Sequence, residues 1–421
     1  MRAPRTRKAG AACTSAVLLG LGVACSGSSG LHHNTIALPA DNVADVFVDY
    51  GLIGYANGLF TTVTVCVPGS TSDCQTIDHV LVDTGSSGLR LLGSVLTLSL
   101  PAFTNDSGVG LAECQQFISG SIWGPLRSAD FKIANEQASN LTIQVIEEST
   151  YPMPSDCTGT DISSPELLGA NGNLGLSSIA QDCGPPCAAA LGPHSENPGL
   201  YYACASATAD GCQAAAVPLA QQLTNPVLFF SQDNNGTIFE LPAIPAEGAP
   251  SVAGSLVFGI GTRDNNGLEQ ASVIRLDDYG QFRTQYPTNS TPTLAFVDSG
   301  SNMMLFLDST TTHIPTCYDA LHPDISDFYC PTATLNLSAK IEDTFGGATL
   351  IVNFSVANAI TLFSGDNIAF NNLAGPSVTP SGQSFMPTYF DWGLPFHFGR
   401  NVFTAIDGQE TPAGQGPFVA F

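Results

Sequence analysis

Positive charge is scarce in this sequence of 421 residues. Lysine and arginine together number 12, against 36 aspartates and glutamates, and the formal net charge at pH 7 is −24. Proteins that bind DNA or RNA need a basic face to neutralise phosphates, so this composition excludes that class. It also argues against docking on anionic lipid headgroups. Charged residues make up only 11% of the chain, so uncharged polar residues and glycine must cover much of the surface.

Long apolar runs are also lacking. Residues 16–24 form an apolar run that is too short to span a bilayer comfortably. This run follows four basic residues within the first eight positions and ends directly before Cys25. A basic segment, a short apolar segment and a small residue at the end are typical of a secretory signal. We therefore predict a signal peptide over residues 1–24 and a Ser/Gly-rich tether over residues 25–42.

Cys25 begins the sequence Cys-Ser-Gly-Ser-Ser-Gly, which is similar to the start of a bacterial lipoprotein. A lipid on Cys25 would then anchor the protein to a membrane through a flexible tether. Gly22 departs from that pattern, because leucine is preferred at its position. The alternative is plain secretion with Cys25 removed or unmodified. Either outcome predicts an exported protein, whether periplasmic, anchored to the outer membrane or secreted.

Twelve cysteines are present, and ten remain when Cys13 and Cys25 are set aside. An even number in an exported chain predicts up to five disulfides. Close neighbours are the natural pairs, namely Cys66 with Cys74 and Cys317 with Cys330. Four more cysteines, between positions 183 and 212, allow three pairings. A zinc site there is disfavoured, because no histidine pair follows at ligand spacing. Residues 183–216, rich in cysteine, alanine and glycine, predict a disulfide-pinned surface insertion.

Most of the chain has the pattern of β-structure. Residues rich in β-branched and aromatic side chains recur between dense turn signals, at 59–67, 141–145, 255–258, 349–354 and 417–421. Helical signals are few, and the best lies over residues 214–223. This pattern predicts an all-β architecture with few short helices.

An internal repeat is the most informative feature of the sequence. An apolar strand ends in Asp83-Thr84-Gly85-Ser86, and Leu174-Gly175 follows about ninety residues later. A second apolar strand ends in Asp298-Ser299-Gly300-Ser301, and Phe398-Gly399 follows at nearly the same distance. This shared order predicts two similar lobes, over residues 43–240 and 241–421.

The repeat places one aspartate at the end of a buried strand in each lobe. If the lobes meet by a pseudo-two-fold axis, Asp83 and Asp298 face each other. Two buried carboxylates at short distance cannot both ionise easily, so they share a proton and titrate as a pair. The ionised member can take a proton from water while the protonated member donates to a substrate carbonyl.

At these motifs the sequence resembles the pepsin-like aspartic peptidases, and the resemblance covers most of the mature chain. It implies a bilobal, all-β pepsin-like double-psi barrel fold. Asp83 and Asp298 would be the catalytic pair, Ser86 and Ser301 would hold their outer oxygens, and Thr84 and Ser299 would brace the two loops. The remaining residues that match the motifs are glycines, at Gly85, Gly300, Gly175 and Gly399.

The sequence departs from that family at its flap. The family has a tyrosine before a Gly-Thr-Gly-Ser pattern, and the best match here is Phe117, followed by Gly120 and Ser121. Arg90 stands where the family has the tryptophan that bonds the flap tyrosine. A cation–π contact between Phe117 and Arg90 is one hypothesis for this double change. No cleavable pro-segment is evident between Cys25 and the first strand.

These features predict an exported aspartic endopeptidase that needs no metal or other cofactor. Its partner would be an extended peptide or unfolded protein, bound as a strand by a monomer. The alternative is a catalytically inactive pepsin-fold lipoprotein, which would act as a cell-surface binding protein or scaffold through the same cleft or the Cys-rich insertion.

Overall fold

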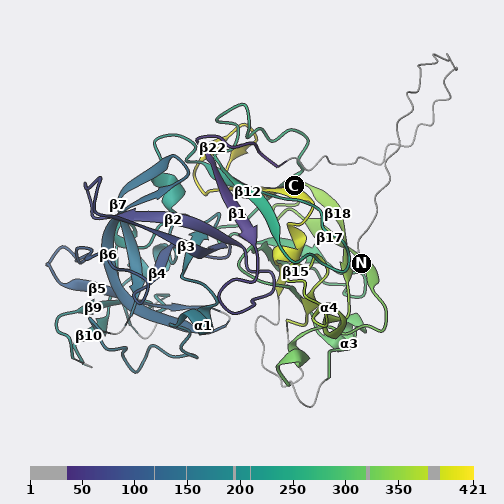
Figure 1. Cartoon of the computed structure of the whole chain (residues 1–421), viewed down its shortest axis with the longest axis horizontal. Helices are drawn as coiled ribbons and strands as arrows, with labels where there is room; N and C mark the ends of the chain where they lie inside the picture. Colours follow the sequence, from purple (N-terminus) through teal and green to yellow (C-terminus); the bar gives the residue numbers. More distant parts are fainter. Residues whose placement is uncertain are drawn as a thin grey trace, which may run out of the picture. The chain divides into compact units, whose positions relative to one another are not determined.

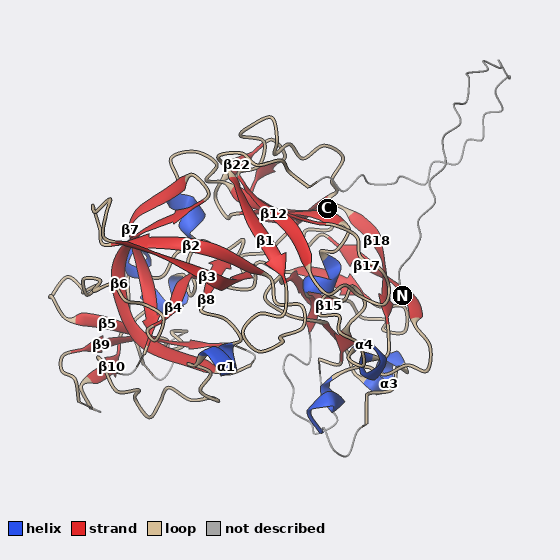
Figure 2. Ribbon diagram, viewed as in Figure 1, coloured by secondary structure: helices blue, strands red, loops and turns tan. Residues whose placement is uncertain are grey.

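The computed structural model describes residues 36–117, 119–147, 149–192, 196–208, 210–318, 323–377 and 389–421. The predicted signal peptide and Cys25 lie outside the described residues. The described residues belong to one compact unit, Asn34–Phe421. Strands dominate it (Figure 2), and its α-helices are single turns: α1 (Pro165–Leu168), α2 (Pro185–Ala188), α3 (Ser309–Thr312) and α4 (Ala359–Leu362). The predicted all-β class is confirmed.

A 15-stranded sheet contains every strand of the first half and several of the second (Figure 1). Its order is β10 (Cys212–Ala214), β9 (Tyr201–Cys204), β5 (Gly110–Gln116), β6 (Ser121–Ile133), β7 (Glu136–Ile146), β4 (Ser87–Leu92), β8 (Gly172–Leu176), β3 (Cys74–Asp83), β2 (Phe60–Cys66), β1 (Val43–Val48), β12 (Val252–Phe258), β11 (Gly236–Leu241), β21 (Arg400–Ala405), β24 (Phe418–Ala420) and β13 (Val273–Arg275).

A seven-stranded sheet contains most of the remaining strands of the second half. Its order is β18 (Thr349–Val356), β17 (Leu335–Glu342), β14 (Phe282–Gln285), β15 (Thr293–Val297), β20 (Tyr389–Trp392), β16 (Met304–Phe306) and β19 (Ala374–Gly375). A short hairpin, β22 (Glu410–Thr411) and β23 (Gly414–Gln415), completes the strands. The 3-10 helices are η1 (Leu219–Gln221), η2 (Pro226–Phe229), η3 (Pro323–Asp327) and η4 (Leu394–Phe396).

Each half contains a psi-shaped loop of three strands. In the first half β8 lies between β3 and β4, parallel to β3 and antiparallel to β4. In the second half β20 lies between β15 and β16, parallel to β15 and antiparallel to β16. The strands before and after each Asp-Ser/Thr-Gly motif therefore enclose a later strand. The predicted double-psi fold is confirmed by these two loops.

The residues that complete the second loop differ from those predicted. Gly175 lies on β8 opposite Asp83, as expected. The counterpart of β8 is Tyr389–Trp392, so Gly393 rather than Gly399 follows at the equivalent position. A Cβ atom on Gly393 would lie 2.1 Å from the carbonyl oxygen of Met303, and one on Gly175 would lie 2.7 Å from that of Ser86. Both glycines therefore allow the inserted strand to pack against the backbone that follows the motif.

The ten cysteines among the described residues form five disulfides. The predicted pairs Cys66–Cys74 and Cys317–Cys330 are confirmed. The four cysteines between 183 and 212 pair as neighbours, Cys183 with Cys187 and Cys204 with Cys212. The fifth disulfide, Cys114–Cys157, fastens β5 to the loop that follows β7.

Three local predictions are wrong. Residues 214–223 form no α-helix, because Pro218 interrupts the segment and leaves only η1 after the end of β10. The insertion 183–216 is not purely a surface feature, since β9 pairs with β5 and Tyr201 is fully buried. The end of the predicted tether is packed, because Asn42 is buried and its amide donates to the carbonyl of Phe258 at 2.8 Å.

Candidate active site

Asp83 and Asp298 face each other where the two psi loops meet. A Cβ atom on Gly85 would lie 2.7 Å from Oδ2 of Asp298, and one on Gly300 would lie 2.6 Å from Oδ1 of Asp83. Each carboxyl group thus occupies the space beside the glycine of the opposite loop. Only glycine at these two positions permits so close an approach.

The two aspartates have matching hydrogen bonds. The amide of Gly85 donates to Oδ1 of Asp83 and the amide of Gly300 to Oδ1 of Asp298, both at 2.7 Å. Ser86 Oγ donates to Oδ2 of Asp83 at 2.5 Å, and Ser301 Oγ lies 2.9 Å from Oδ2 of Asp298. The structure thus brings both serines to the carboxyl oxygens that the sequence pattern assigns to them.

Thr84 and Ser299 connect the loops to each other. The amide of Thr84 donates to Ser299 Oγ at 3.1 Å, and the amide of Ser299 donates to Thr84 Oγ1 at 3.0 Å. Each hydroxyl then donates to a strand carbonyl across the interface, Thr84 to Val297 and Ser299 to Val82. Because each hydroxyl both accepts and donates, the four bonds fix the separation of the two aspartates.

Burial and mutual repulsion set the protonation of the pair. Asp83 and Asp298 are 6% and 8% exposed. Burial, followed by the charge of Asp83, raises the pKa of Asp298 far above that of an ordinary aspartate. Asp298 therefore keeps its proton under mildly acidic to neutral conditions.

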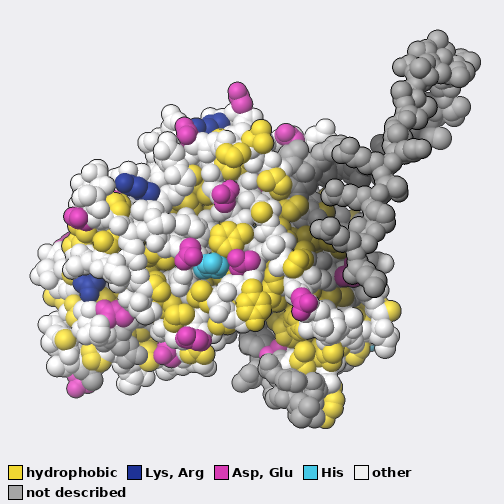
Figure 3. All heavy atoms as spheres, in the orientation of Figure 1, with side chains coloured by type: hydrophobic (Ala, Val, Ile, Leu, Met, Phe, Trp, Pro, Cys, Tyr) yellow, Lys and Arg dark blue, Asp and Glu magenta, His cyan; other side chains and the backbone are white. Residues whose placement is uncertain are grey.

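A cavity of about 850 Å³ opens in front of the aspartates. This volume lies in the range of sites that enclose small ligands or several side chains of a peptide. The side chains that line it include Leu167, Tyr279, Phe296, Met303 and Tyr389. The walls around the polar floor are therefore largely apolar and aromatic. Acidic side chains are spread over the molecular face in Figure 3, where basic ones are sparse.

The hairpin of β5 and β6 forms one wall of this cavity. The amide of Phe117 donates to the carbonyl of Gly120 at 2.7 Å and closes the hairpin turn. Phe117 lines the cavity and also packs, partly buried, against the cluster formed by Leu92, Ile122, Ile146 and Ile162. Gly120 and Ser121 pack instead on residues 160–162, because a Cβ on Gly120 would lie 2.2 Å from the carbonyl of Thr160.

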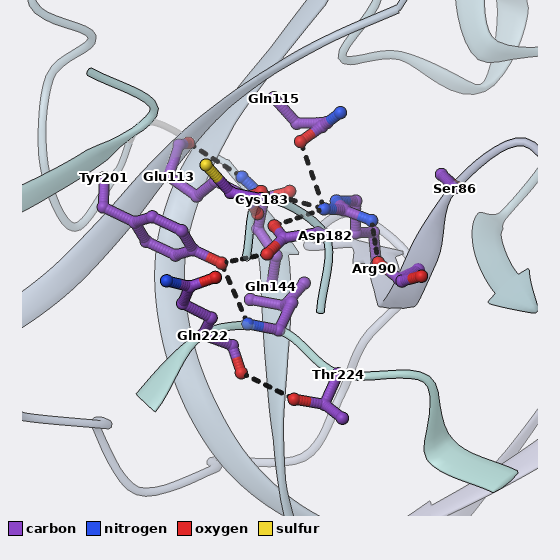
Figure 4. Close-up of polar contacts among 12 residues, drawn as sticks. Ser86, Arg90, Glu113, Gln115, Gln144, Asp182, Cys183, Tyr201, Gln222 and Thr224 are labelled. Carbon is purple, nitrogen blue, oxygen red and sulfur yellow. Dashed lines mark hydrogen bonds and ion pairs between the residues drawn. The ribbon is translucent and has the colours of Figure 1, made fainter. Parts of the chain in front are cut away.

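Arg90 does not stack on Phe117, and the cation–π hypothesis is wrong. Its guanidinium is fully buried and donates to Oε1 of Glu113 at 2.8 Å and to Oδ2 of Asp182 at 3.1 Å (Figure 4). It also donates to the carbonyl of Ser87 at 2.8 Å. Burial opposes the charge of Arg90, but the charge of Glu113, followed by that of Asp182, raises its pKa. Arg90 therefore stays cationic beneath the hairpin.

Asp182 and Tyr201 extend this cluster into the Cys-rich insertion. The hydroxyl of Tyr201 donates to Oδ1 of Asp182 at 2.6 Å and accepts from the amide of Leu223 at 2.9 Å. Burial, followed by the charge of Glu113, raises the pKa of Asp182 well above its ordinary range. Asp182 therefore holds a proton more tightly than an ordinary aspartate does. Sequence reasoning missed this cluster, since its members lie on four separate segments.

Tyr55 is a second residue that sequence reasoning missed. It lines the cavity, and burial together with the charges of Asp298 and Asp83 raises its pKa to about 12. Its phenol is therefore a neutral hydrogen-bond donor beside the aspartates. Asn57 holds this loop against the second half, because its amide donates to the carbonyls of Asn302 and Phe370 at 2.8 and 2.9 Å.

Residues 38–421 match the model of a family described as "Protein of unknown function (DUF3443)". The chain belongs to the DUF3443 family. No curated protein matches the sequence. Among solved structures, this DUF3443 chain is similar to the crystal structure of an aspartic proteinase from Irpex lacteus, with 16% sequence identity and a TM-score of 0.49. That similarity covers 90% of this chain and 96% of the other.

Two further polar residues of the DUF3443 chain lie at equivalent places on the inserted strands. Asn173 on β8 donates to Oδ2 of Asp83 and to Ser86 Oγ, both at 2.9 Å. Oδ2 of Asp391 on β20 lies 2.6 Å from Ser301 Oγ. Sequence reasoning missed both, because it used the segment at Asn173 only for its Leu-Gly pair and placed the second inserted element at Phe398-Gly399, beyond Asp391.

Proposed function

We propose that this protein is an exported aspartic endopeptidase. The observation that carries the proposal is the pair of buried carboxyl groups, one on each psi loop, that face each other at the floor of a cavity of about 850 Å³. This arrangement supplies a base for water and an acid for a carbonyl oxygen at the same point.

The hydrogen bonds support a division of roles between the two aspartates. Asp83 accepts from three donors, the Gly85 amide, Ser86 Oγ and Asn173 Nδ2, which point positive ends of their dipoles at its oxygens. Asp298 accepts from the Gly300 amide and has one further neighbour, Ser301. We therefore assign the base to Asp83 and the acid to Asp298.

In the first step, Asp83 takes a proton from a water molecule as the water oxygen attacks the peptide carbonyl carbon. Asp298 donates its proton to the carbonyl oxygen, and a tetrahedral diol forms. In the second step, Asp83 gives its proton to the amide nitrogen and the C–N bond breaks. Asp298 recovers a proton from a diol hydroxyl as the carbonyl re-forms, so both carboxyl groups return to their starting state.

The cavity supports an extended peptide with apolar side chains near the scissile bond. Phe296 and Leu167 contribute apolar surface to the lining, and Phe117 adds an aromatic ring from the hairpin. Burying apolar side chains there contributes binding free energy in proportion to the area removed from water. Unfolded protein segments are the source of such peptides.

The five disulfides support export, because disulfides persist in oxidising compartments. Among the described residues, no helix is long and apolar enough to cross a membrane. Lipidation of Cys25 stays a prediction from the sequence.

The constraint on the hairpin favours a second candidate, a catalytically inactive binding protein. β5 pairs with β9 on one side and is joined to the loop after β7 by Cys114–Cys157. A hairpin held in this way opens less readily for substrate entry and product release. The cavity would then hold a peptide without cutting it.

Cleavage of a mixed peptide library separates the two candidates. The mature chain is incubated from about pH 2.5 to about pH 7.5 beside Asp83→Asn and Asp298→Asn. Cuts that disappear in both variants are the expected result. A folded wild-type chain that cuts nothing at any pH would instead support the binding protein.

A further inference from the structure

Asp391 and Asn173 occupy the same place in the two psi loops but carry different chemistry. Asn173 pairs with Leu81, two residues before Asp83, and Asp391 pairs with Phe296, two residues before Asp298. The first loop therefore presents an amide to its catalytic aspartate. The second loop presents a carboxyl group, and the site contains three acids instead of two.

The hydroxyl of Ser301 lies between two carboxyl oxygens. Its Oγ is 2.9 Å from Oδ2 of Asp298 and 2.6 Å from Oδ2 of Asp391. A hydroxyl carries one hydrogen and can donate to only one of these oxygens. The other short contact requires a hydrogen on a carboxyl group. A neutral Asp391 would donate to Ser301, and Ser301 would donate to Asp298.

The surroundings of Asp391 favour its neutral form. Its side chain is 3% exposed, and its Oδ1 has no hydrogen-bond partner. Burying an ionised oxygen without a hydrogen-bond partner costs more free energy than burying a neutral carbonyl oxygen without one. The charged groups that act on Asp391 are Asp298 and Asp83, both acidic. Burial, followed by these charges, raises the pKa of Asp391 well above its ordinary range.

We propose that Asp391 is a positioning residue of the site, a buried neutral acid that donates to Ser301 and thereby directs the Ser301 hydrogen at Asp298. Asp83, Asp298 and Asp391 together then hold two protons. The catalytic consequence rests on the proposed function, whereas the protonation of Asp391 does not.

The directed hydrogen bond matters when Asp298 gives its proton to the substrate. The carboxylate that remains accepts from Ser301, whose hydroxyl is polarised by the donor behind it. In the first loop the amide of Asn173 donates to Asp83 directly. Each aspartate thus has a hydrogen-bond donor that stabilises its charged form. For Asp83 this donor is the Asn173 amide, and for Asp298 it is the Ser301 hydroxyl, which Asp391 orients.

Infrared spectra test the protonation without any need for activity. The carbonyl stretch of protonated carboxyl groups is recorded at neutral pH for the wild type, Asp391→Asn and the control Asp308→Asn. Asp308 lies outside the site and its backbone and side-chain hydrogen bonds lower its pKa, so it is ionised there. We expect Asp391→Asn to lose one component that the control keeps. An unchanged band in folded Asp391→Asn would overturn the proposal.

Kinetics with two variants test the positioning role. Asn at position 391 keeps a donor and copies the first loop, so kcat should stay within a few-fold of the wild type. Asp391→Leu removes the donor, and we expect kcat to fall roughly tenfold with KM unchanged and the alkaline limb of the pH profile to move upward. Equal losses in both folded variants would overturn the positioning role.

Ser301→Ala serves if neither variant folds, since it removes the acceptor from Asp391 and should shift the same infrared component. An unshifted component in that variant would also overturn the proposal. A chain that shows the expected spectra but cuts no peptide would refute the proposed function and leave the protonation of Asp391 standing.

Discussion

Arg90 and Asn173 lie directly opposite each other in the antiparallel pairing of β4 with β8, and both side chains are buried. Asn173 contacts the aspartate of its own psi loop, whereas Arg90 contacts acids of the hairpin and the insertion. This single pair of facing residues therefore connects the active site to the wall of the cavity. Both strands are otherwise apolar or small, so these two polar residues are the costly exceptions.

Removal of Arg90 should destabilise the fold strongly. Arg90→Leu leaves Glu113 and Asp182 buried without their cation, and the loss of one partner of a buried ion pair costs about 3–5 kcal/mol. Arg127→Ala is the matched control, because Arg127 is partly exposed and 3.9 Å from Glu147, and such pairs contribute about 0–1 kcal/mol. Urea unfolding of both variants measures the difference. Similar losses would contradict the buried cluster.

Gly393 should tolerate no side chain. In Gly393→Ala the new methyl group would lie 2.1 Å from the Met303 carbonyl oxygen, so the end of β20 must move away from the backbone at Ser301 and Met303. We expect lower thermal stability and loss of peptide cleavage. Gly192→Ala is the control, because no atom lies within 4 Å of its Cβ position. Full activity in Gly393→Ala would mean that β20 does not complete the loop as described.

The phenol of Tyr55 should contribute to turnover. Its hydroxyl stays protonated beside Asp83 and Asp298, where it can donate to charge that develops on the substrate. We expect Tyr55→Phe to lower kcat/KM about tenfold or more with little change in stability. Tyr279→Phe is compared with it, since Tyr279 lines the same cavity but is 76% exposed. Equal effects of the two substitutions would argue against a role for the Tyr55 hydroxyl.

Stability should fall as the pH rises from acidic to neutral. Burial raises the pKa of Glu240 from 4.5 to about 7, so the folded state binds this proton more tightly than the unfolded chain does. The resulting stabilisation is complete below pH 4.5 and is lost as the pH passes about 7. Glu240→Gln should flatten the fall in Tm over this interval, whereas Glu166→Gln, at a helix terminus, should not. A profile unchanged by Glu240→Gln would refute this assignment.

The two-lobed order of the motifs along the sequence was predictable, because apolar strands that end in Asp-Ser/Thr-Gly leave a clear pattern. The strand that is inserted beside the second motif was not predicted correctly. Gly175 follows Gly85 by 90 residues, whereas Gly393 and Gly399 follow Gly300 by 93 and 99 residues, so spacing alone already favours Trp392-Gly393. The sequence analysis chose Phe398-Gly399, and the strand pairing corrects that choice. Arg90 was recognised as unusual, but its partners lie at positions 113 and 182, and sequence distance hides such contacts. Asn173 and Asp391 escaped notice because single polar residues within apolar strands resemble interruptions of a pattern.

The pairing of β9 with β5 has a consequence for motion. The hairpin beside the cavity is the inner part of a four-stranded segment, β10-β9-β5-β6, rather than two strands that project alone (Figure 1). Backbone hydrogen bonds on both sides of β5 must move together or break together. An opening of the hairpin would therefore have to move β9 with it or break the pairing of β9 with β5, and the exchange of β5 amide hydrogens with solvent should be slow.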